Sequence, residues 1–202
     1  SLVCLDLTPL AASRSLQSID LADNRLETTD LGFLSKCESE IELDLSENRL
    51  QQIDLGPIAE MPGRIVSLNL SHNRIKHIDL SPLAKSGIQR LNLGSNEIAQ
   101  VDLSPLQECE GLRELYLFLN PLRSLDLSPL AGHDRIETLS LDSTKLQELN
   151  VTPLFSCDRL EYLEIDDDLR LTAVLKDASP DFDNTEGLHL KLLKLKCTKG
   201  LR

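Results

Sequence analysis

The strongest constraint on the fold is a short motif that recurs every 23 to 25 residues along the chain. Its first three copies are Asn24-Arg25-Leu26, Asn48-Arg49-Leu50 and Asn73-Arg74-Ile75. We call its first residue the Asn position, and coils one to seven are numbered by its occupants, Asn24, Asn48, Asn73, Asn96, Asn120, Thr144 and Asp168. A period of this length is typical of a solenoid, in which each coil buries its apolar face only against its neighbours.

Apolar residues recur at fixed distances from the Asn position. Five residues before it stand Ile19, Leu43, Leu68, Leu91, Leu115, Leu139 and Leu163, and three before it stand Leu21, Leu45, Leu70, Leu93, Leu117, Leu141 and Ile165. Because apolar and polar residues alternate here, we expect one short strand per coil and a parallel sheet with strands about 4.8 Å apart. Each Asn amide is predicted to satisfy backbone groups of its own and the adjacent coil.

The second half of each repeat predicts a short turn of helix. Ser81-Pro82, Ser104-Pro105 and Ser128-Pro129 fit an N-cap followed by a first helical position. The segments are so short that 3₁₀ turns are the alternative.

This pattern, LxxLxLxxNxL followed by IDLSPL, resembles the leucine-rich repeat family in its short, prokaryotic or internalin-like form, from Leu2 to about Thr198. The resemblance implies an α/β fold, a right-handed horseshoe-shaped solenoid with a concave parallel sheet and short helical or 3₁₀ turns on the convex side. We expect a single domain over residues 1–202. Residues 1–15 form a partial first repeat, 16–178 the repeats, and 179–202 an inserted loop and a terminal coil.

Two places depart from the frame. Coil two has Glu40 at an apolar position with Ile41 beside it, which indicates a local shift of one residue. In the C-terminal coil, Lys191, Lys194 and Lys196 would face Glu161, Glu164 and Asp166 of coil seven, as a charge-matched end or as a polar binding ridge. Since the chain starts and stops inside repeats, we expect either a piece of a longer protein or self-association through uncapped ends.

Composition excludes two classes of partner. The chain carries 33 acidic and 21 basic residues and a formal charge of −12, which disfavours nucleic acid, since phosphate binding needs a basic surface. No stretch without a charged residue is longer than that from Ile65 to Asn73, which is too short to span a membrane.

The five cysteines predict buried thiols and not a disulfide framework or a zinc site. Cys37, Cys109 and Cys157 share one repeat position, and Cys109 and Cys157 lie two coils apart, about 10 Å, which is too far to bridge. The absence of CxxC clusters argues against zinc. The odd number of cysteines and the absence of the cysteine-rich flanks typical of extracellular leucine-rich repeats favour a reducing compartment, so we expect an intracellular, cytoplasmic protein.

A column of acids precedes the Ser-Pro turns. Its members are Asp6, Asp30, Asp54, Asp79, Asp102 and Asp126, with Asn150 in the next coil. Stacked carboxylates repel, so we expect backbone N–H groups of the following turn to offset the charge. The alternative is a calcium column, and a divalent-ion site at Glu164 to Asp168 with Asp181 and Asp183 is a related idea.

Catalysis finds little support in the sequence. The four histidines have no Ser or Cys near them in a recognisable motif, and no glycine-rich phosphate loop is present. Arg25, Arg49 and Arg74 form an exposed row that fits a solvated face or a phosphate or GTPase partner. We therefore predict no enzymatic activity, no cofactor and no metal.

The rare aromatics point to a partner surface. The residues two, four and six before the Asn position face outward, and they are small or polar in coils one to three. In coil five they become Glu114, Tyr116 and Phe118, with Leu119 next, and coil seven places Tyr162 there. The alternative is that Phe118 and Leu119 fold over the strand edge and pack locally. Arg90 joins this patch, and acidic residues rim it; the predicted binding residues are therefore Tyr116, Phe118, Leu119, Tyr162, Arg90, Glu114, Asp142, Glu164 and Asp166.

The predicted function is a protein-binding module whose partner is basic around an apolar centre. The alternative is a regulatory leucine-rich repeat subunit, or a targeting domain of a larger signalling enzyme, either GTPase-activating or kinase-linked. Fold alone does not choose between them.

Overall fold

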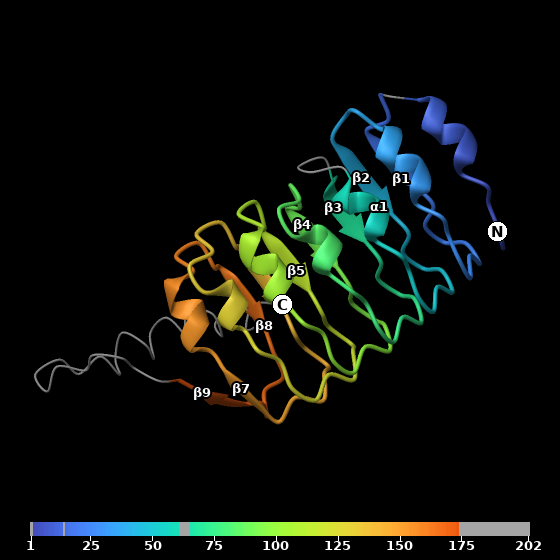
Figure 1. The fold of residues 1–202 in the computed structure, drawn as a ribbon. Helices are drawn as coiled ribbons and strands as arrows, with labels where there is room; N and C mark the ends of the chain where they lie inside the picture. The colour runs from blue at the N-terminus through green and yellow to red at the C-terminus, as the bar shows by residue number, and fades with distance from the viewer. Residues whose placement is uncertain (1, 14, 61–64, 174–202) are drawn as a thin grey trace, which may run out of the picture.

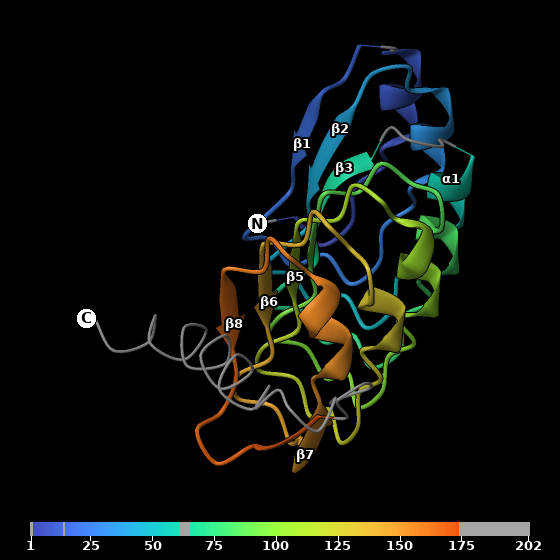
Figure 2. The same cartoon turned by 90° about the vertical axis from the view of Figure 1, so that its left-hand side faces the viewer.

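The computed structural model describes residues 2–13, 15–60 and 65–173. Within these ranges the chain winds into stacked coils, each with a strand on one side and, in most coils, a short helical turn on the other (Figure 1). Strands and helical turns form two layers (Figure 2).

The strands of the main sheet are β1 (Ser18–Asp20), β2 (Ile41–Asp44), β3 (Ile65–Asn69), β4 (Arg90–Asn92), β5 (Glu114–Tyr116), β6 (Thr138–Ser140) and β8 (Tyr162–Glu164). The opposite layer holds η1 (Thr8–Ala12), η2 (Gly32–Lys36), α1 (Gly56–Ala59), η3 (Ser81–Leu83), η4 (Ser104–Glu108), η5 (Ser128–Leu130) and η6 (Thr152–Ser156).

The strands pair in parallel and in the register that the repeat predicts. Leu68 of β3 stands beside Leu91 of β4, and Leu91 stands beside Leu115 of β5. The parallel solenoid with 3₁₀ turns on its convex side is thus confirmed. A second sheet, which the sequence did not predict, joins β7 (Glu148–Asn150) to β9 (Arg170–Thr172).

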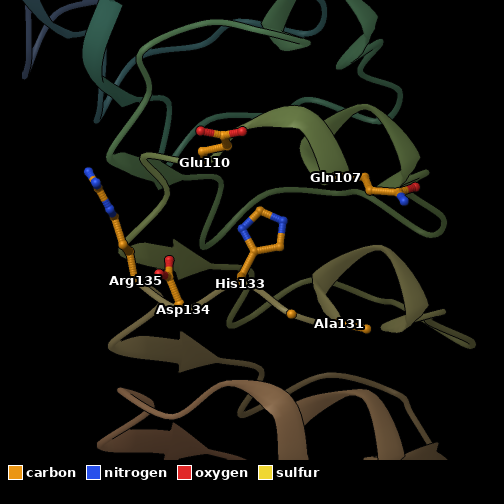
Figure 3. Close-up of a pocket in the computed structure, with 7 residues that line it drawn as sticks. Gln107, Glu110, Ala131, His133, Asp134 and Arg135 are labelled. Atoms are coloured by element: carbon orange, nitrogen blue, oxygen red, sulfur yellow. The ribbon is translucent and has the colours of Figure 1, made fainter.

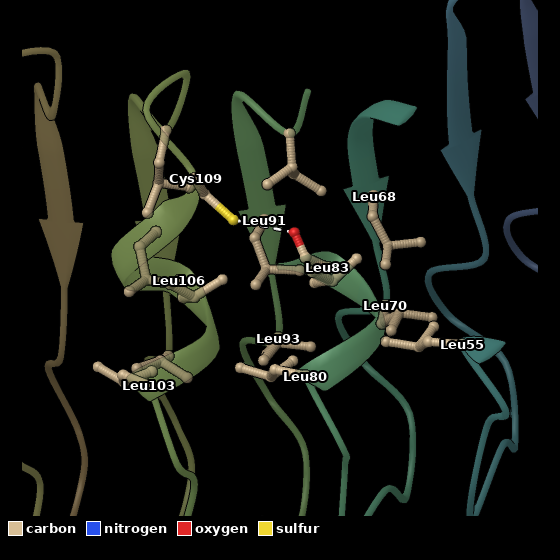
Figure 4. Close-up of a cluster of buried hydrophobic side chains, with 14 of the residues drawn as sticks. Leu55, Leu68, Leu70, Leu80, Leu83, Leu91, Leu93, Leu103, Leu106 and Cys109 are labelled. Carbon is tan, nitrogen blue, oxygen red and sulfur yellow. Dashed lines mark hydrogen bonds between the residues drawn. The ribbon is translucent and has the colours of Figure 1, made fainter. Parts of the chain in front are cut away.

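The interior is filled by aliphatic side chains from both layers (Figure 4). Leu68 and Leu91 of the strands and Leu83 and Leu106 of the turns have no exposed surface. Burying a leucine contributes roughly 1.5–3 kcal/mol, so repeated leucines stabilise the solenoid although almost no aromatics enter the core.

The Asn side chains connect successive coils, as predicted. The Asn73 amide donates to Leu45 O at 2.9 Å, to Leu70 O at 3.1 Å and to Ser71 O at 3.2 Å. Its Oδ1 accepts the amide of Leu50 at 2.9 Å. Asn48, Asn96 and Asn120 repeat this pattern.

The serines of the Ser-Pro turns are not N-caps, so that prediction was wrong. Leu80 is the N-cap of η3 and no side chain caps it, while Ser81 is already the first helical residue. The Ser81 amide instead donates to Asp79 Oδ1 at 2.8 Å. The same bond recurs along the acidic column, so backbone N–H groups of the turns offset the negative charge of the stacked carboxylates, as predicted.

The cysteine prediction is confirmed in part. Cys37, Cys109 and Cys157 are buried, whereas Cys4 is exposed, because residues 2–7 have a neighbouring coil on one side only among the described residues. Cys197 lies outside the described residues.

The two departures from the frame have different outcomes. Ile41 is buried in place of the exposed Glu40, which confirms the one-residue shift in coil two. The loop and terminal coil at 179–202, with Lys191, Lys194 and Lys196, lie outside the described residues.

Candidate functional site

The concave side chains four residues before the Asn position are structural in coils one to four. Each accepts the amide of the residue two further on, which stabilises the turn that leaves the strand. The acceptors are Asp20, Asp44, Asn69 and Asn92, with distances of 3.0, 2.8, 3.1 and 2.9 Å. Tyr116 occupies this position in coil five, and its side chain cannot accept that bond in the same geometry. Coil five therefore uses the position for something other than the turn.

Tyr116 belongs to a hydrogen-bonded group with Glu114 and Arg90. Its hydroxyl donates to Glu114 Oε2 at 2.8 Å. Arg90 donates to the same carboxylate from Nε at 2.9 Å and from a terminal nitrogen at 3.3 Å. Burial and the Glu114 hydrogen bond raise the pKa of Tyr116 to about 12, so the phenol stays protonated at neutral pH.

The Glu114 carboxylate is committed within the molecule. Burial would raise its pKa, but the hydrogen bonds from Arg90 and Tyr116 outweigh burial and hold the pKa below its usual range. The bond to Glu114 in turn raises the pKa of Arg90. Glu114 thus fixes the Tyr116 ring and the Arg90 guanidinium in place.

Phe118 does not point straight out of the sheet but lies over coil four. A Cβ at Gly94 would overlap the Phe118 ring, so the ring fills the space that a side chain would otherwise occupy. The ring also meets His72 of coil three and Tyr116 edge-on, with centroids 6.3 and 6.5 Å away. Such contacts contribute about 0.5–1.5 kcal/mol each beyond burial.

Leu119 combines exposure with an unfavourable backbone conformation. The residue before the Asn position has positive φ in coils one to six: Asp23 at 53°, Glu47 at 54°, His72 at 55°, Ser95 at 54°, Leu119 at 52° and Ser143 at 56°. Asp, Asn and His tolerate this region better than most residues, and leucine does not. Leu119 is also 51% exposed, so core packing does not explain its presence.

The acidic rim lies one and two coils beyond this group. Tyr162 is 50% exposed and stands beside Thr138, which stands beside Glu114 in the sheet. Glu164 is exposed beside Ser140. Asp142 accepts the Ser140 hydroxyl at 2.9 Å. Asp166 accepts the amide of Ser143 at 2.7 Å, so it also stabilises a turn.

The structure thus joins the sequence-predicted residues into a core group and a rim. Arg90, Glu114, Tyr116 and Phe118 are in direct contact or linked through one neighbour, whereas Tyr162 and Glu164 are separated from them by β6. Sequence reasoning missed His72 and Gly94. A glycine two residues before the Asn position, where other coils carry a side chain, was the available signal.

A hollow of about 320 Å³ between coils five and six is the strongest alternative site (Figure 3). The buried His133 ring points between Gln107 and Glu110, and its Nε2 has no hydrogen-bond partner among the described residues. Burial lowers the pKa of His133, which favours the neutral imidazole. His133 shares its repeat position with Cys109 and Cys157, whose thiols donate to carbonyls of the preceding coil, so its place in the fold favours a structural role.

The described ranges contain neither a candidate metal site nor a candidate membrane-spanning helix. No group of three or more His, Cys, Asp or Glu side chains there could hold a metal ion. No helix in those ranges has the length and apolar character that crossing a bilayer requires.

The coil geometry defines the class of protein, a solenoid of parallel repeats, and the sequence comparison identifies its family. The leucine-rich repeat family model matches residues 14–75 and 63–122, more than half of the chain. The chain belongs to the leucine-rich repeat family, whose fold is commonly a protein-interaction module. A search of the curated proteins found no match.

The chain is similar to several leucine-rich repeat proteins of known structure. A leucine-rich repeat protein of Leptospira interrogans is 22% identical with a TM-score of 0.68, over 94% of this chain and 43% of that one. The functional domain of InlJ from Listeria monocytogenes, which includes a cysteine ladder, is 21% identical with a TM-score of 0.46, over 86% of this chain and 44% of that one. An internalin of Listeria monocytogenes, InlF, is 26% identical with a TM-score of 0.48, over 85% and 51%. The chain therefore spans about half or less of the length of these proteins.

Proposed function

We propose that this protein is a binding module that captures a protein partner on its concave face, around Tyr116, Phe118 and Leu119. The observation that carries the proposal is the change of chemistry in coil five. There, a row that caps turns in coils one to four is replaced by an aromatic pair, followed by an exposed leucine in an unfavourable conformation. Sites that break a local rule without a packing gain are candidates for function, and Leu119, exposed and at positive φ, is such a site.

The chemistry around the patch favours a partner that is basic around an apolar centre. Asp142, Glu164 and Asp166 supply negative charge on the coil-seven side. Aromatic anchors contribute most of the energy of such interfaces, and complementary charge steers the encounter. The buried thiols of Cys109 and Cys157 support a reducing, cytoplasmic location as part of the proposal.

Affinity capture from the native lysate, with mass spectrometry, would identify the partner, and binding is then measured with purified proteins. We expect Tyr116→Ala with Phe118→Ala to weaken binding by at least about 2 kcal/mol while the circular dichroism spectrum is unchanged. Ser18→Glu, on the concave face of coil one, is the matched control and leaves binding intact. The opposite result, loss with Ser18→Glu and not with the double variant, contradicts the proposed site.

Leu119→Asn separates binding from stability. Asparagine tolerates positive φ, so the free energy of unfolding is unchanged or increases. Binding weakens because the exposed apolar contact is lost. A variant that binds like wild type removes Leu119 from the proposal. The alternative, a regulatory subunit or a targeting domain of a larger signalling enzyme, stays a prediction because it concerns segments beyond these 202 residues.

A further inference from the structure

A second hollow opens on the concave face, between coil two and coils four and five. It measures about 230 Å³, and its lining includes Glu40, Glu42, Val66, Ser67, Arg90 and Arg113. In the sheet, Glu42 stands beside Ser67 and Ser67 stands beside Arg90. The short Ser67 side chain therefore separates two long charged side chains, whose Cα atoms lie two strand spacings, about 9.6 Å, apart.

The floor of the hollow owes its shape to an irregularity in strand β3. Ile41 pairs with Ile65, but Glu42 pairs with Ser67, so Val66 is an extra residue without a partner on β2. Val66 and Ser67 are both half-buried. Bulges of this kind redirect side chains and are frequent next to functional sites. The bulge gives the floor a small apolar surface beside a small polar one.

The charges around the hollow are unequal once pairs are matched. Arg90 is paired with Glu114 at 2.9 Å, and Arg113 is paired with Glu137 at 3.3 Å. Glu40 and Glu42 are exposed and form no hydrogen bond or ion pair with any described residue. The negative charge of Glu42 also contributes to the raised pKa of Arg90, although Glu114 contributes more, which places Glu42 within electrostatic range of the hollow.

We propose that this hollow binds the cationic side chain of a lysine or arginine of the protein partner. The aliphatic stem of such a side chain covers Val66, and its charged end pairs with the carboxylates of Glu42 and Glu40. The inference rests on the proposed function, since the hollow adjoins the Tyr116 group through Arg90 and Glu114. It places basic residues of the partner on both sides of the apolar centre, over coil two as well as over coil seven.

The test uses the full chain and a small probe, so that it does not depend on finding the partner. Backbone amide shifts are recorded by NMR while Nα-acetyl-arginine amide, Nα-acetyl-lysine amide or neutral Nα-acetyl-citrulline amide is added. We expect saturable shifts at the amides of Ser67 and Gln89 with the two cations and none with citrulline. Glu42→Gln weakens the probe about threefold, as expected for an exposed ion pair.

Two variants complete the test. Glu47→Gln removes an exposed carboxylate of the same coil that does not line the hollow, and it leaves the probe affinity unchanged. Ser67→Leu fills the hollow without removing a charge, and it abolishes the shifts. Equal affinity of wild type and Glu42→Gln, or shifts confined to coils six and seven, overturns the inference. Neither result touches the Tyr116 and Phe118 experiment, so failure of the two proposals is distinguishable.

Discussion

Coils one to five and coils six and seven contribute to one sheet but satisfy their turns in different ways. In coils two to five, the Asn amide makes three donor bonds and accepts one from the preceding coil, as at Asn120. In coil six the position holds Thr144, whose Oγ1 is buried and has no hydrogen-bond partner in the part of the chain that the structure describes. Asp166 of coil seven adds a different pair of bonds: its carboxylate accepts the amides of Ser143 at 2.7 Å and Thr144 at 3.3 Å, whereas the corresponding amides of coil three, those of His72 and Asn73, donate to backbone carbonyls.

The difference teaches that the repeat tolerates loss of its Asn where neighbouring coils supply other bonds. Near coil six the chain adds β7 and β9, a second sheet that links coils six and seven by backbone hydrogen bonds, such as Val151 N to Thr172 O at 2.9 Å. The same region carries the acidic rim of the proposed site. The aromatic centre of that site, Tyr116 and Phe118, lies in the last of the regular coils.

The largest expected effect comes from breaking the regular region. The Asn73 side chain bonds to three backbone carbonyls and one backbone amide, and Asn73→Ala leaves these groups without a partner. We therefore expect a loss of about 3 kcal/mol in the free energy of unfolding. Urea denaturation measures it. The matched change in the irregular region is Thr144→Val, which removes a hydroxyl that has no hydrogen-bond partner among the described residues. We expect it to lower the free energy of unfolding by less than about 1 kcal/mol. Equal losses for the two variants contradict the comparison.

The reverse experiment restores the regular pattern in coil six. Thr144→Asn places an amide beside Leu117 O and a carbonyl oxygen beside the amide of Leu122, which corresponds to Ile98 in the coil before. We expect the variant to be more stable by about 1 kcal/mol. Differential scanning calorimetry on the full chain tests this. A lower melting temperature contradicts the expectation and shows that the bonds of Asp166 leave no room for an amide at position 144.

The repeat frame allowed the strands, the core leucines and the Asn bonds to be predicted, because a period fixes which face each residue occupies. It did not give the direction of a side chain along the solenoid. Phe118 was predicted to face outward, whereas its ring packs over Gly94 of the preceding coil, which depends on the empty space there. Glu114 was predicted to meet the partner, whereas Arg90 and Tyr116 occupy its carboxylate.

The second sheet was equally beyond the repeat pattern. Residues 148–150 follow the same template as residues 124–126, yet only the former pair as a strand, with residues 170–172. That pairing depends on where the chain goes after Asp168, where the frame degrades. Departures from a repeat are visible in a sequence, but the contacts that they create come from three-dimensional neighbours.

A smaller effect distinguishes the two regions by pH. Hydrogen bonds from the hydroxyl and amide of the following serine lower the pKa of Asp79, Asp102 and Asp126. A lowered folded-state pKa means that the carboxylate stabilises the fold above the unfolded pKa of about 3.9, and that this stabilisation is lost as the pH falls through the lower folded-state values. Asn150 makes the corresponding bond to Thr152 at 3.0 Å with a neutral oxygen.

We therefore expect Asp79→Asn, Asp102→Asn and Asp126→Asn together to reduce the fall in stability between about pH 4 and pH 2, while stability at pH 7 changes little. Urea midpoints at several pH values measure the effect. Asn150→Asp is the matched control and adds acid sensitivity to coil six. If the pH dependence of stability is the same in the triple variant and wild type, the three carboxyls have the same pKa in the folded and the unfolded chain, which contradicts the prediction.

The smallest expected effect concerns the repeat position that holds a cysteine in coil five and again in coil seven. Cys109 in coil five donates its thiol proton to Leu83 O at 3.0 Å (Figure 4), and Cys157 in coil seven donates to Leu130 O at 3.2 Å. Burial raises the pKa of Cys109 above its usual range, although a hydrogen bond from Ser86 opposes it, so the thiol stays protonated and is a poor metal ligand.

Since each thiol serves as a hydrogen-bond donor, neither dithiothreitol nor EDTA should change the melting temperature. A drop of several degrees with dithiothreitol would indicate a disulfide, and one with EDTA a structural metal. The Cys109→Ser variant adds a further test. A serine hydroxyl also donates a hydrogen bond, although its oxygen lies closer to Cβ than the sulfur does, so we expect the variant to lower the stability of coil five only slightly.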